Sequence, residues 1–205
     1  MLEPVYYLFI GLVAGLIIVA PIGPIAILCI RRTLSSGRIA GIVSGLGAAT
    51  ADFFYGAVAA FGLAFISSFL LGEMAWLRII GGLFLIYLGV RTFLSKPADK
   101  PAQAKYSLTG AYVSTFLLTI TNPMTILSFA AAFSGIGSLM ENASLATAGF
   151  FSLGIFLGSV VWWLILCSAV DLFRGKLTPP AMAWVNRISG AIIALFGVVA
   201  LAGLL

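Results

Sequence analysis

The sequence contains no histidine and very little charge. Only 8% of its 205 residues are charged, whereas a soluble domain carries about 25%, so the chain lacks the polar surface of an ordinary soluble protein. The absence of histidine excludes His-based catalytic triads and the common metal-ligand sets. We therefore expect a protein that is not an enzyme and that needs neither a metal ion nor another cofactor.

Cysteine is also scarce, and acidic residues are fewer than basic ones. The two cysteines, Cys29 and Cys167, lie in apolar stretches, where a thiol usually behaves as a small hydrophobic group. The net charge is +5, which in a soluble protein would suggest a nucleic-acid partner. Here the positive charges lie in short loops between apolar stretches, so they report membrane orientation and predict no nucleic-acid partner.

Long apolar stretches dominate what is present, since 62% of the residues are hydrophobic. A membrane helix needs roughly 20 apolar residues. The first stretch is too long for a signal peptide and has no basic residue before it, so we expect it to remain in the mature protein. Six stretches qualify as spans: residues 6–30, 39–61, 76–94, 108–133, 145–170 and 184–204.

The positive charges predict how the spans are oriented. Nearly all lysines and arginines lie in the loops that follow the first, third and fifth spans or at the ends of the spans beside those loops. The opposite side of the membrane carries only Arg78. Because positive loops stay in the cytoplasm, we expect both termini outside it. The cytoplasmic residues would be Arg31, Arg32, Arg38, Arg91, Lys96, Lys100, Lys105, Arg174, Lys176 and Arg187.

The six spans resemble a three-helix unit used twice. We expect a first repeat at 1–95, a cytoplasmic linker at 96–107 and a second repeat at 108–205, all in one membrane domain. A repeat with an odd number of spans must re-enter the membrane inverted; six unrelated helices remain the alternative. The alignment pairs Gly11 with Gly110, Pro24 with Pro123, Gly45 with Gly154, Gly82 with Gly190 and Gly89 with Gly197.

Prolines interrupt the first and fourth spans at matching places. Proline breaks the backbone hydrogen bonding of a helix, and lipid cannot satisfy the freed carbonyls, so such breaks are tolerated where they line a cavity. Half-helix ends can hold the carboxylate and the ammonium of an amino acid. The alternative is a pair of kinks that only shape packing. The predicted substrate pathway comprises Pro21, Gly23 and Pro24 in the first span and Thr121, Asn122, Pro123 and Thr125 in the fourth.

Asp52 is the only acid well inside a span. An ionised side chain at the bilayer centre costs roughly 2.5–3.5 kcal/mol, so it should face the protein interior and either titrate or pair. We expect Asp52 to bind the coupling proton or cation; a purely structural acid is the alternative. Tyr55, one turn further on, could form a cation–π surface with Trp162 and Trp163.

Several of these segments together resemble the LysE-type amino-acid exporter family. They are residues 21–24, 31–34 and 45–52, the Asn122-Pro123 segment, and residues 186–190 at the start of the last span. The resemblance covers essentially the whole chain. It implies a multi-pass, dimeric exporter of amino acids in the bacterial inner membrane, driven by the proton motive force. By residue, it implies roles for Gly23, Pro24, Asp52, Asn122 and Pro123, while Ile25 stands where many members have a polar residue.

The sequence therefore predicts an all-α secondary transporter that exports amino acids or small amino-acid derivatives with proton coupling. Four alternatives stay open: export of another small solute, export of a metal ion, a membrane thiol–electron carrier, and a scaffold without transport activity, which would not need paired helix breaks. A metal exporter would need more intramembrane carboxylates or histidines than the spans offer. A thiol carrier would need cysteines at equivalent repeat positions, but Ser128 is the equivalent of Cys29.

Overall fold

The computed structural model describes residues 3–21, 23–60, 74–94, 107–129, 144–174 and 178–202. Within these residues the chain is all helical, which confirms the predicted class. The linker expected at 96–107 lies outside them except for Ser107. The helices are α1 (Glu3–Val19), α2 (Pro24–Ser36), α3 (Arg38–Ala60), α5 (Met74–Phe93), α6 (Leu108–Thr121), α8 (Leu145–Arg174) and α9 (Pro179–Ala202), with a further helical stretch at 123–129.

Helix lengths identify a multi-pass membrane protein. Three described helices are long and apolar enough to cross a membrane alone: Arg38–Ala60, Leu145–Phe173 and Pro180–Ala202. The segments Val5–Val19 and Pro24–Ser36 would form a fourth span if they act as one, although they meet at 82°. The apolar segments Ile79–Phe93 and Leu108–Thr121 are shorter. The first and fourth predicted spans are thus each divided into two helical pieces, at the places where the prolines stand.

The first predicted span ends later than expected. Instead of stopping near residue 30, the helix after the break continues to Ser36. The sequence predicts Arg31 and Arg32 in the cytoplasmic loop after the first span or at the ends of the spans beside it. In the structure both arginines lie within α2. Because arginine is a good helix former, the backbone has no local reason to stop before Gly37, whose φ of 101° is a conformation that favours glycine.

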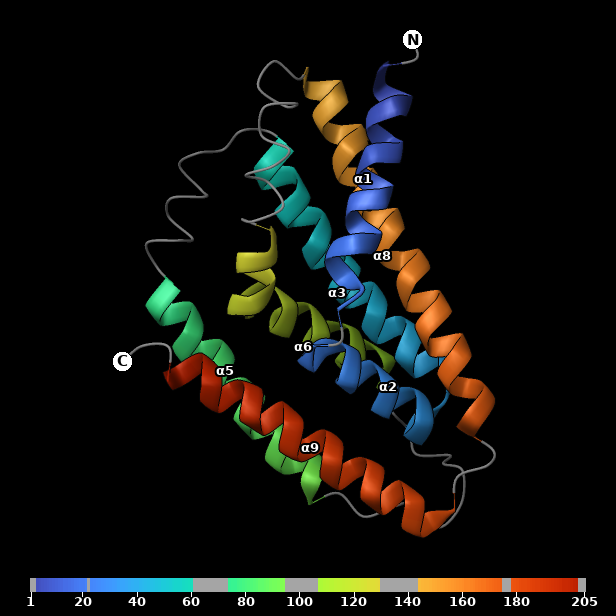
Figure 1. Ribbon diagram of the computed structural model, residues 1–205, viewed down its shortest axis with the longest axis vertical. Helices are drawn as coiled ribbons and strands as arrows, with labels where there is room; N and C mark the ends of the chain where they lie inside the picture. Colours follow the sequence, from blue (N-terminus) through green and yellow to red (C-terminus); the bar gives the residue numbers. More distant parts are fainter. Residues whose placement is uncertain are drawn as a thin grey trace.

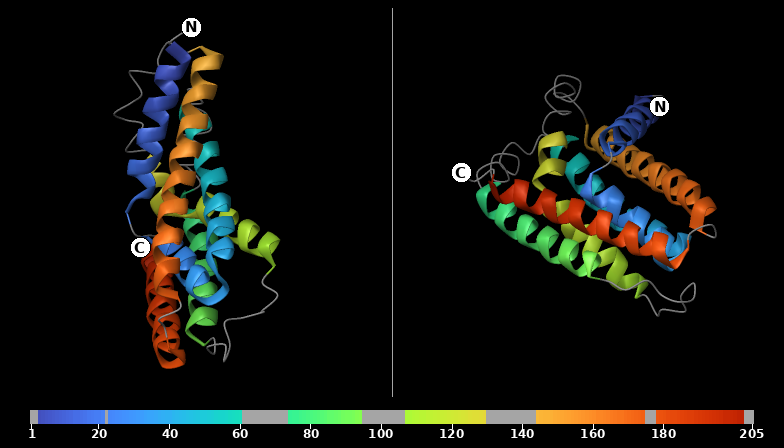
Figure 2. Two further views of the ribbon diagram at one scale, coloured as in Figure 1. Left: turned by 90° about the vertical axis from the view of Figure 1, so that its right-hand side faces the viewer. Right: turned by 60° about the horizontal axis from the view of Figure 1, so that its bottom comes forward.

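The helices pack in pairs that join distant parts of the chain. Figure 1 shows α1 lying along α8, and α5 lying along α9. α3 contacts both α8 and α6, and α2 lies among α3, α8 and α9. Figure 2 shows the α5–α9 pair at one side of the bundle and the α1–α8 pair at another. The half-helix α2 is therefore surrounded by protein close to the break that precedes it.

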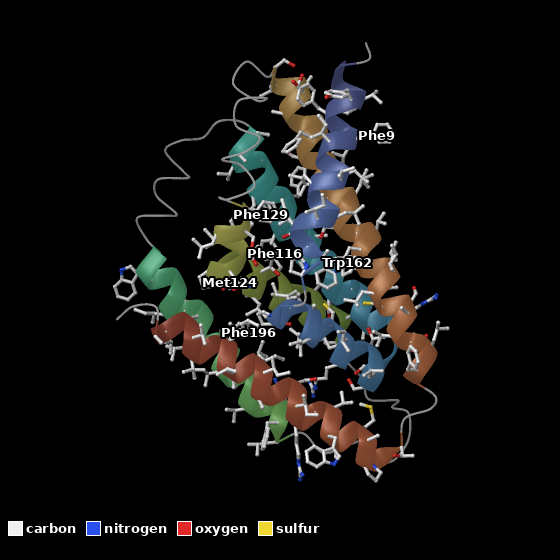
Figure 3. The ribbon with its side chains drawn as sticks, in the orientation of Figure 1. Phe9, Phe116, Met124, Phe129, Trp162 and Phe196 are labelled. Carbon is white, nitrogen blue, oxygen red and sulfur yellow. The ribbon has the colours of Figure 1, made fainter. Side chains whose placement is uncertain are left out.

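Glycines allow the closest helix pair to form. A Cβ atom at Gly15 would lie 2.9 Å from the Cα of Ile155, and one at Gly154 would lie 2.8 Å from the backbone nitrogen of Leu12. Such separations leave no room for a side chain, so α1 and α8 touch through their backbones, as small residues permit in membrane helices. Large apolar side chains instead cover the outside: Phe9 points away from the bundle while Phe129 and Phe196 lie within it (Figure 3).

Candidate functional site

The first helix break is built by glycine and proline. α1 ends at Val19 and α2 begins at Pro24. Gly23 precedes α2 in an extended conformation (φ −105°, ψ −170°), and its carbonyl accepts the first helical bond from Ile27 N–H at 3.1 Å. Pro24 occupies the first helical position, where a missing N–H costs nothing because that group has no helical partner. The chain can thus leave one helix and start another at a sharp angle.

The second break repeats this arrangement with a polar residue. α6 ends at Thr121, Asn122 is extended (φ −77°, ψ 113°), and the helix resumes at Pro123. The Asn122 carbonyl accepts from Ile126 N–H at 3.1 Å, as the Gly23 carbonyl does from Ile27. The Asn122 side chain also accepts a bond from Met124 N–H at 3.2 Å. Asn122, the aligned equivalent of Gly23, therefore caps its own half-helix.

Tyr55 supports the second break. In an unbroken helix the Ile120 carbonyl would accept from Met124 N–H, but that N–H is used by Asn122. The Tyr55 hydroxyl donates to the Ile120 carbonyl instead, at 2.5 Å, and the Tyr55 ring stacks on Phe129 with centroids 5.2 Å apart. Tyr55 does not line the cavity that is described in the next paragraph. Its hydroxyl instead satisfies a backbone carbonyl at the second break.

A cavity of about 290 Å³ lies where the two breaks meet. Two of the predicted site residues, Thr121 and Pro123, do not line the cavity. The Thr121 hydroxyl instead donates to the Leu117 carbonyl at 2.7 Å. Thr119, which we expect near the second break, and Ser128, whose part in the lining we did not predict, contribute further hydroxyls. The predicted residues that the structure brings together around the cavity are Pro21, Gly23, Pro24, Asp52, Asn122 and Thr125.

Asp52 reaches the cavity from α3 and is only 2% exposed. Its Oδ2 accepts a hydrogen bond from Ser159 Oγ at 2.7 Å, and the indole N–H of Trp163 donates to Ser159 Oγ at 3.1 Å. The indole thus fixes the serine hydroxyl, and the hydroxyl fixes the carboxyl group. Sequence reasoning missed Ser159, because nothing in the sequence distinguishes it from the other serines of the apolar spans.

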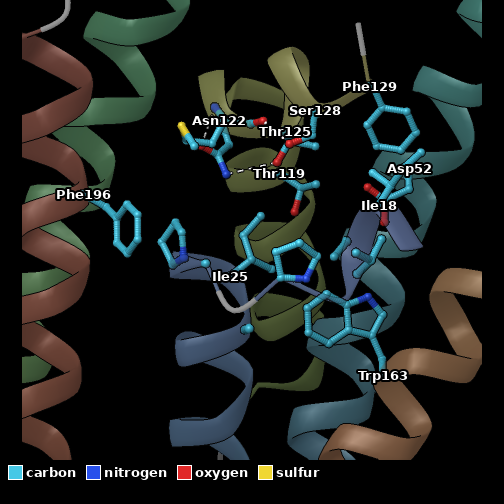
Figure 4. Close-up of a pocket in the computed structure, with 17 residues that line it drawn as sticks. Ile18, Ile25, Asp52, Thr119, Asn122, Thr125, Ser128, Phe129, Trp163 and Phe196 are labelled. Carbon is cyan, nitrogen blue, oxygen red and sulfur yellow. Dashed lines mark hydrogen bonds between the residues drawn. The ribbon is translucent and has the colours of Figure 1, made fainter. Parts of the chain in front are cut away.

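The remaining cavity wall is mostly apolar. Figure 4 shows Asp52 and Phe129 on one side, Asn122 and Thr125 on another, and Trp163 below Asp52. Phe196 enters from α9, opposite α3. The cation–π hypothesis places Tyr55, Trp162 and Trp163 at the site. Of these three residues, only Trp163 is among the residues that line the cavity.

A buried arginine joins the helices next to the cavity. Arg32 is 4% exposed and donates to Ser44 Oγ on α3 at 2.8 Å. On α6 it donates to the Ala111 carbonyl at 2.9 Å, to Thr115 Oγ1 at 2.6 Å and to Ser114 Oγ at 2.8 Å. The half-helix that starts at the first break is thus held against both halves of the chain. Its burial was not predicted, because a loop arginine and a buried one look alike in sequence.

Two of the alternative functions would use a group of metal ligands or a pair of cysteines at the cavity. Among the described residues, no group of three or more His, Cys, Asp or Glu side chains could hold a metal ion. Cys29 and Cys167 are both free and buried and belong to one apolar core cluster. Neither lines the cavity.

Comparison with known proteins places the chain in a family. It is 28% identical over 191 residues to the protein named "Putative amino acid efflux protein YcgF" of Bacillus subtilis (strain 168), covering 91% of this chain and 90% of that one. It is also 28% identical over 202 residues to the "Uncharacterized membrane protein YahN" of Escherichia coli (strain K12), covering 95% and 89%. No solved structure matches. The family model described as LysE type translocator matches residues 16–203, so the chain belongs to the LysE type translocators.

Proposed function

We propose that this protein is a secondary active transporter that exports amino acids or small amino-acid derivatives across the bacterial inner membrane. The observation that carries the proposal is the cavity in which both helix breaks and one buried carboxyl group meet. In secondary transporters, unwound backbone at the interface of two repeats is the usual place for a solute. Family membership and the name of the Bacillus subtilis relative support the same class of activity.

The N-terminus of α2 suits the carboxylate of an amino acid. Residues Gly23 to Ala26 line the cavity, and the first amides of a helix have no partner within it. Gly23 offers no side-chain cap, and nothing lies within 4 Å of the place where its Cβ would be, so a ligand could approach this helix end. At the second break the Asn122 side chain already accepts the Met124 N–H. We therefore assign the substrate carboxylate to the first break.

Asp52 is our candidate for ion coupling. It is a buried carboxyl group on the cavity wall, and Ser159 bonds only its Oδ2, which leaves Oδ1 to bind a proton or the substrate ammonium. Exchange of one charge against a potential of 100 mV supplies about 2.3 kcal/mol, which sustains roughly a fifty-fold concentration gradient. That is adequate for an exporter that relieves an excess of amino acid.

Glycine contacts between α5 and α9 support an inverted repeat. A Cβ at Gly82 would lie 3.0 Å from the Gly197 carbonyl oxygen, and one at Gly89 would lie 2.7 Å from the Gly190 carbonyl oxygen. The sequence alignment makes Gly197 the equivalent of Gly89 and Gly190 the equivalent of Gly82. Each glycine therefore contacts the equivalent of the other, which is what a two-fold relation between antiparallel helices produces. We extend the proposal to six spans, to termini outside the cytoplasm and to a homodimer.

Transport in proteoliposomes tests the function. The purified protein should release loaded amino acid faster when an inward proton gradient is imposed. Asp52→Asn should abolish this stimulation while the protein stays folded. Asp171→Asn serves as the matched control, because Asp171 is a second acid that lies on α8 and does not line the cavity. Normal proton-driven export by Asp52→Asn would show that Asp52 is not the coupling site, and no export of any amino acid by the parent protein would overturn the proposal.

The same vesicles separate the alternatives. Changing both cysteines to serine should leave export intact, since neither thiol reaches the cavity. Loss of all activity in that double variant, with the protein still folded, would favour the thiol–electron carrier. Transport of divalent cations but not amino acids would favour the metal exporter.

A further inference from the structure

The part of the cavity wall that the structure describes carries one ionisable side chain. Among the described residues that line it, Asp52 is the single acid and there is no lysine or arginine. The buried Arg32 is directed to α3 and α6 and is not a lining residue. An acidic side chain of a substrate would therefore meet no cation among the described lining residues. A basic side chain would have to compete for Asp52 with the ammonium of the same substrate.

Most of the polar groups on the wall are already engaged by the protein. Thr119 Oγ1 donates to the Thr115 carbonyl at 2.8 Å, and Ser128 Oγ donates to the Met124 carbonyl at 2.8 Å. The Asn122 side chain accepts from the Met124 amide and donates to Thr125 Oγ1 at 3.0 Å. The donor hydrogens of Thr119 and Ser128 are thus used within their own helical segments, and the described wall offers no further charged group for a substrate side chain.

Carbon covers the rest of the wall. Phe196 lies on the side of the cavity away from Asp52, Ile25 lies between them in this view, and Trp163 and Phe129 flank Asp52 (Figure 4). Pockets for drug-sized ligands measure roughly 300–1,000 Å³, so a cavity of about 290 Å³ fits a single small metabolite. If the ammonium binds at Asp52 and the carboxylate at the start of α2, the side chain of the substrate is left to contact Ile25 and Phe196.

From this arrangement we infer that the substrates are neutral amino acids with an apolar side chain of the size of leucine, methionine or phenylalanine, and that Phe196 on α9 determines this selectivity. The inference rests on the proposed export function. Basic and acidic amino acids are rejected because their side-chain charges would be buried without a partner. Alanine is disfavoured because it leaves the apolar wall uncovered, and one missing methylene alone is worth about tenfold or more in a hydrophobic pocket.

Counterflow measures this selectivity directly. Proteoliposomes loaded with unlabelled leucine are placed in labelled leucine, and other amino acids compete from outside. Methionine and phenylalanine should compete about as well as leucine, alanine at least about tenfold more weakly, and lysine and glutamate not measurably. If lysine or glutamate proves the best substrate, this inference is wrong and the export function stands. If vesicles loaded with each amino acid in turn show no counterflow, the export function itself fails.

Substitution of Phe196 tests its part in the selectivity. Phe196→Ala should raise the KM for leucine about tenfold or more and leave that for alanine nearly unchanged, because only the longer side chain reaches the ring. Leu195→Ala is the matched control, since Leu195 is its neighbour on α9 and is 61% exposed on the outside. If Phe196→Ala proves poorly folded, Phe196→Leu replaces it, with a smaller change of the same sign. An unchanged ratio of the two KM values in a folded Phe196 variant would refute the assignment.

Discussion

The hydroxyl of Tyr55 should stabilise the fold more than that of Tyr112. Both tyrosines donate one hydrogen bond between α3 and α6. Tyr55 donates to the Ile120 carbonyl at 2.5 Å, and Tyr112 donates to Thr50 Oγ1 at 2.8 Å. The Ile120 carbonyl loses its helical partner because of the break, whereas the Thr50 hydroxyl also donates to the Leu46 carbonyl. Tyr55→Phe therefore strands a backbone group, and Tyr112→Phe does not.

The two substitutions should differ measurably in stability. A stranded polar group costs roughly 1–3 kcal/mol, and an ordinary side-chain bond between membrane helices contributes about 0.6 kcal/mol. For a protein of this size 1 kcal/mol shifts Tm by about 2–4 °C. At the middle of the first range, about 2 kcal/mol, Tyr55→Phe should lower Tm by about 4–8 °C, and Tyr112→Phe should lower it by about 1–2 °C.

Thermal unfolding of the purified protein in detergent, followed by size-exclusion or intrinsic fluorescence, measures both shifts under one condition. The stacking of Tyr55 on Phe129 is kept in Tyr55→Phe, so the difference reports the hydroxyl alone. Equal shifts for the two variants, or a larger shift for Tyr112→Phe, would refute the idea that Tyr55 satisfies a backbone group freed by the second break.

Three further predictions concern other parts of the structure. Asn122→Ala removes the cap of the second half-helix and should lower stability by about 0.5–2 kcal/mol, and Asn122→Ser, which retains an N-cap oxygen, should recover part of it in the same unfolding assay. Gly89→Ala should destabilise the α5–α9 pair, because its Cβ would lie 2.5 Å from the Ala194 backbone nitrogen. Gly149→Ala should leave Tm unchanged, because nothing lies within 4 Å of its Cβ. Equal Tm values for the two variants would contradict this prediction. Arg32→Met removes the donor of four hydrogen bonds, three of them buried. It should cost about 1.5–3 kcal/mol, measured as a lower Tm, with Arg32→Lys less severe. A Tm like that of the parent would disprove this.

The places of the two breaks could be predicted from the sequence because proline acts locally. Pro24 and Pro123 each start a new helical piece wherever the surrounding chain goes. The direction of the new piece could not be predicted, because the 82° angle between α1 and α2 depends on how α2 packs among other helices. Asp52 could be singled out because an acid inside an apolar span is rare.

The partners of these residues could not be predicted in the same way. Ser159 meets Asp52 because α3 packs on α8. Arg32 is buried because α2 packs among other helices and the arginine side chain bonds to α3 and α6. Tyr55 was expected on the substrate pathway as an aromatic surface, but its hydroxyl serves the Ile120 carbonyl. Each of these residues has a partner far away in the chain: Asp52 on α8, Arg32 and Tyr55 on α6. No local pattern encodes such a contact.

The pairing of α1 with α8 and of α5 with α9 has a consequence for how the protein is made. Each pair joins an early helix to a late one, so α1 and α5 enter the membrane before their partners have been synthesised. The glycine-rich face of α1 lacks its final neighbour until α8 arrives, because the atoms nearest to Gly11 and Gly15 in the finished protein belong to the backbone of α8. Assembly of the bundle therefore follows insertion of its helices, and a ribosome that stops before α8 would leave an inserted chain whose first helix still lacks its neighbour.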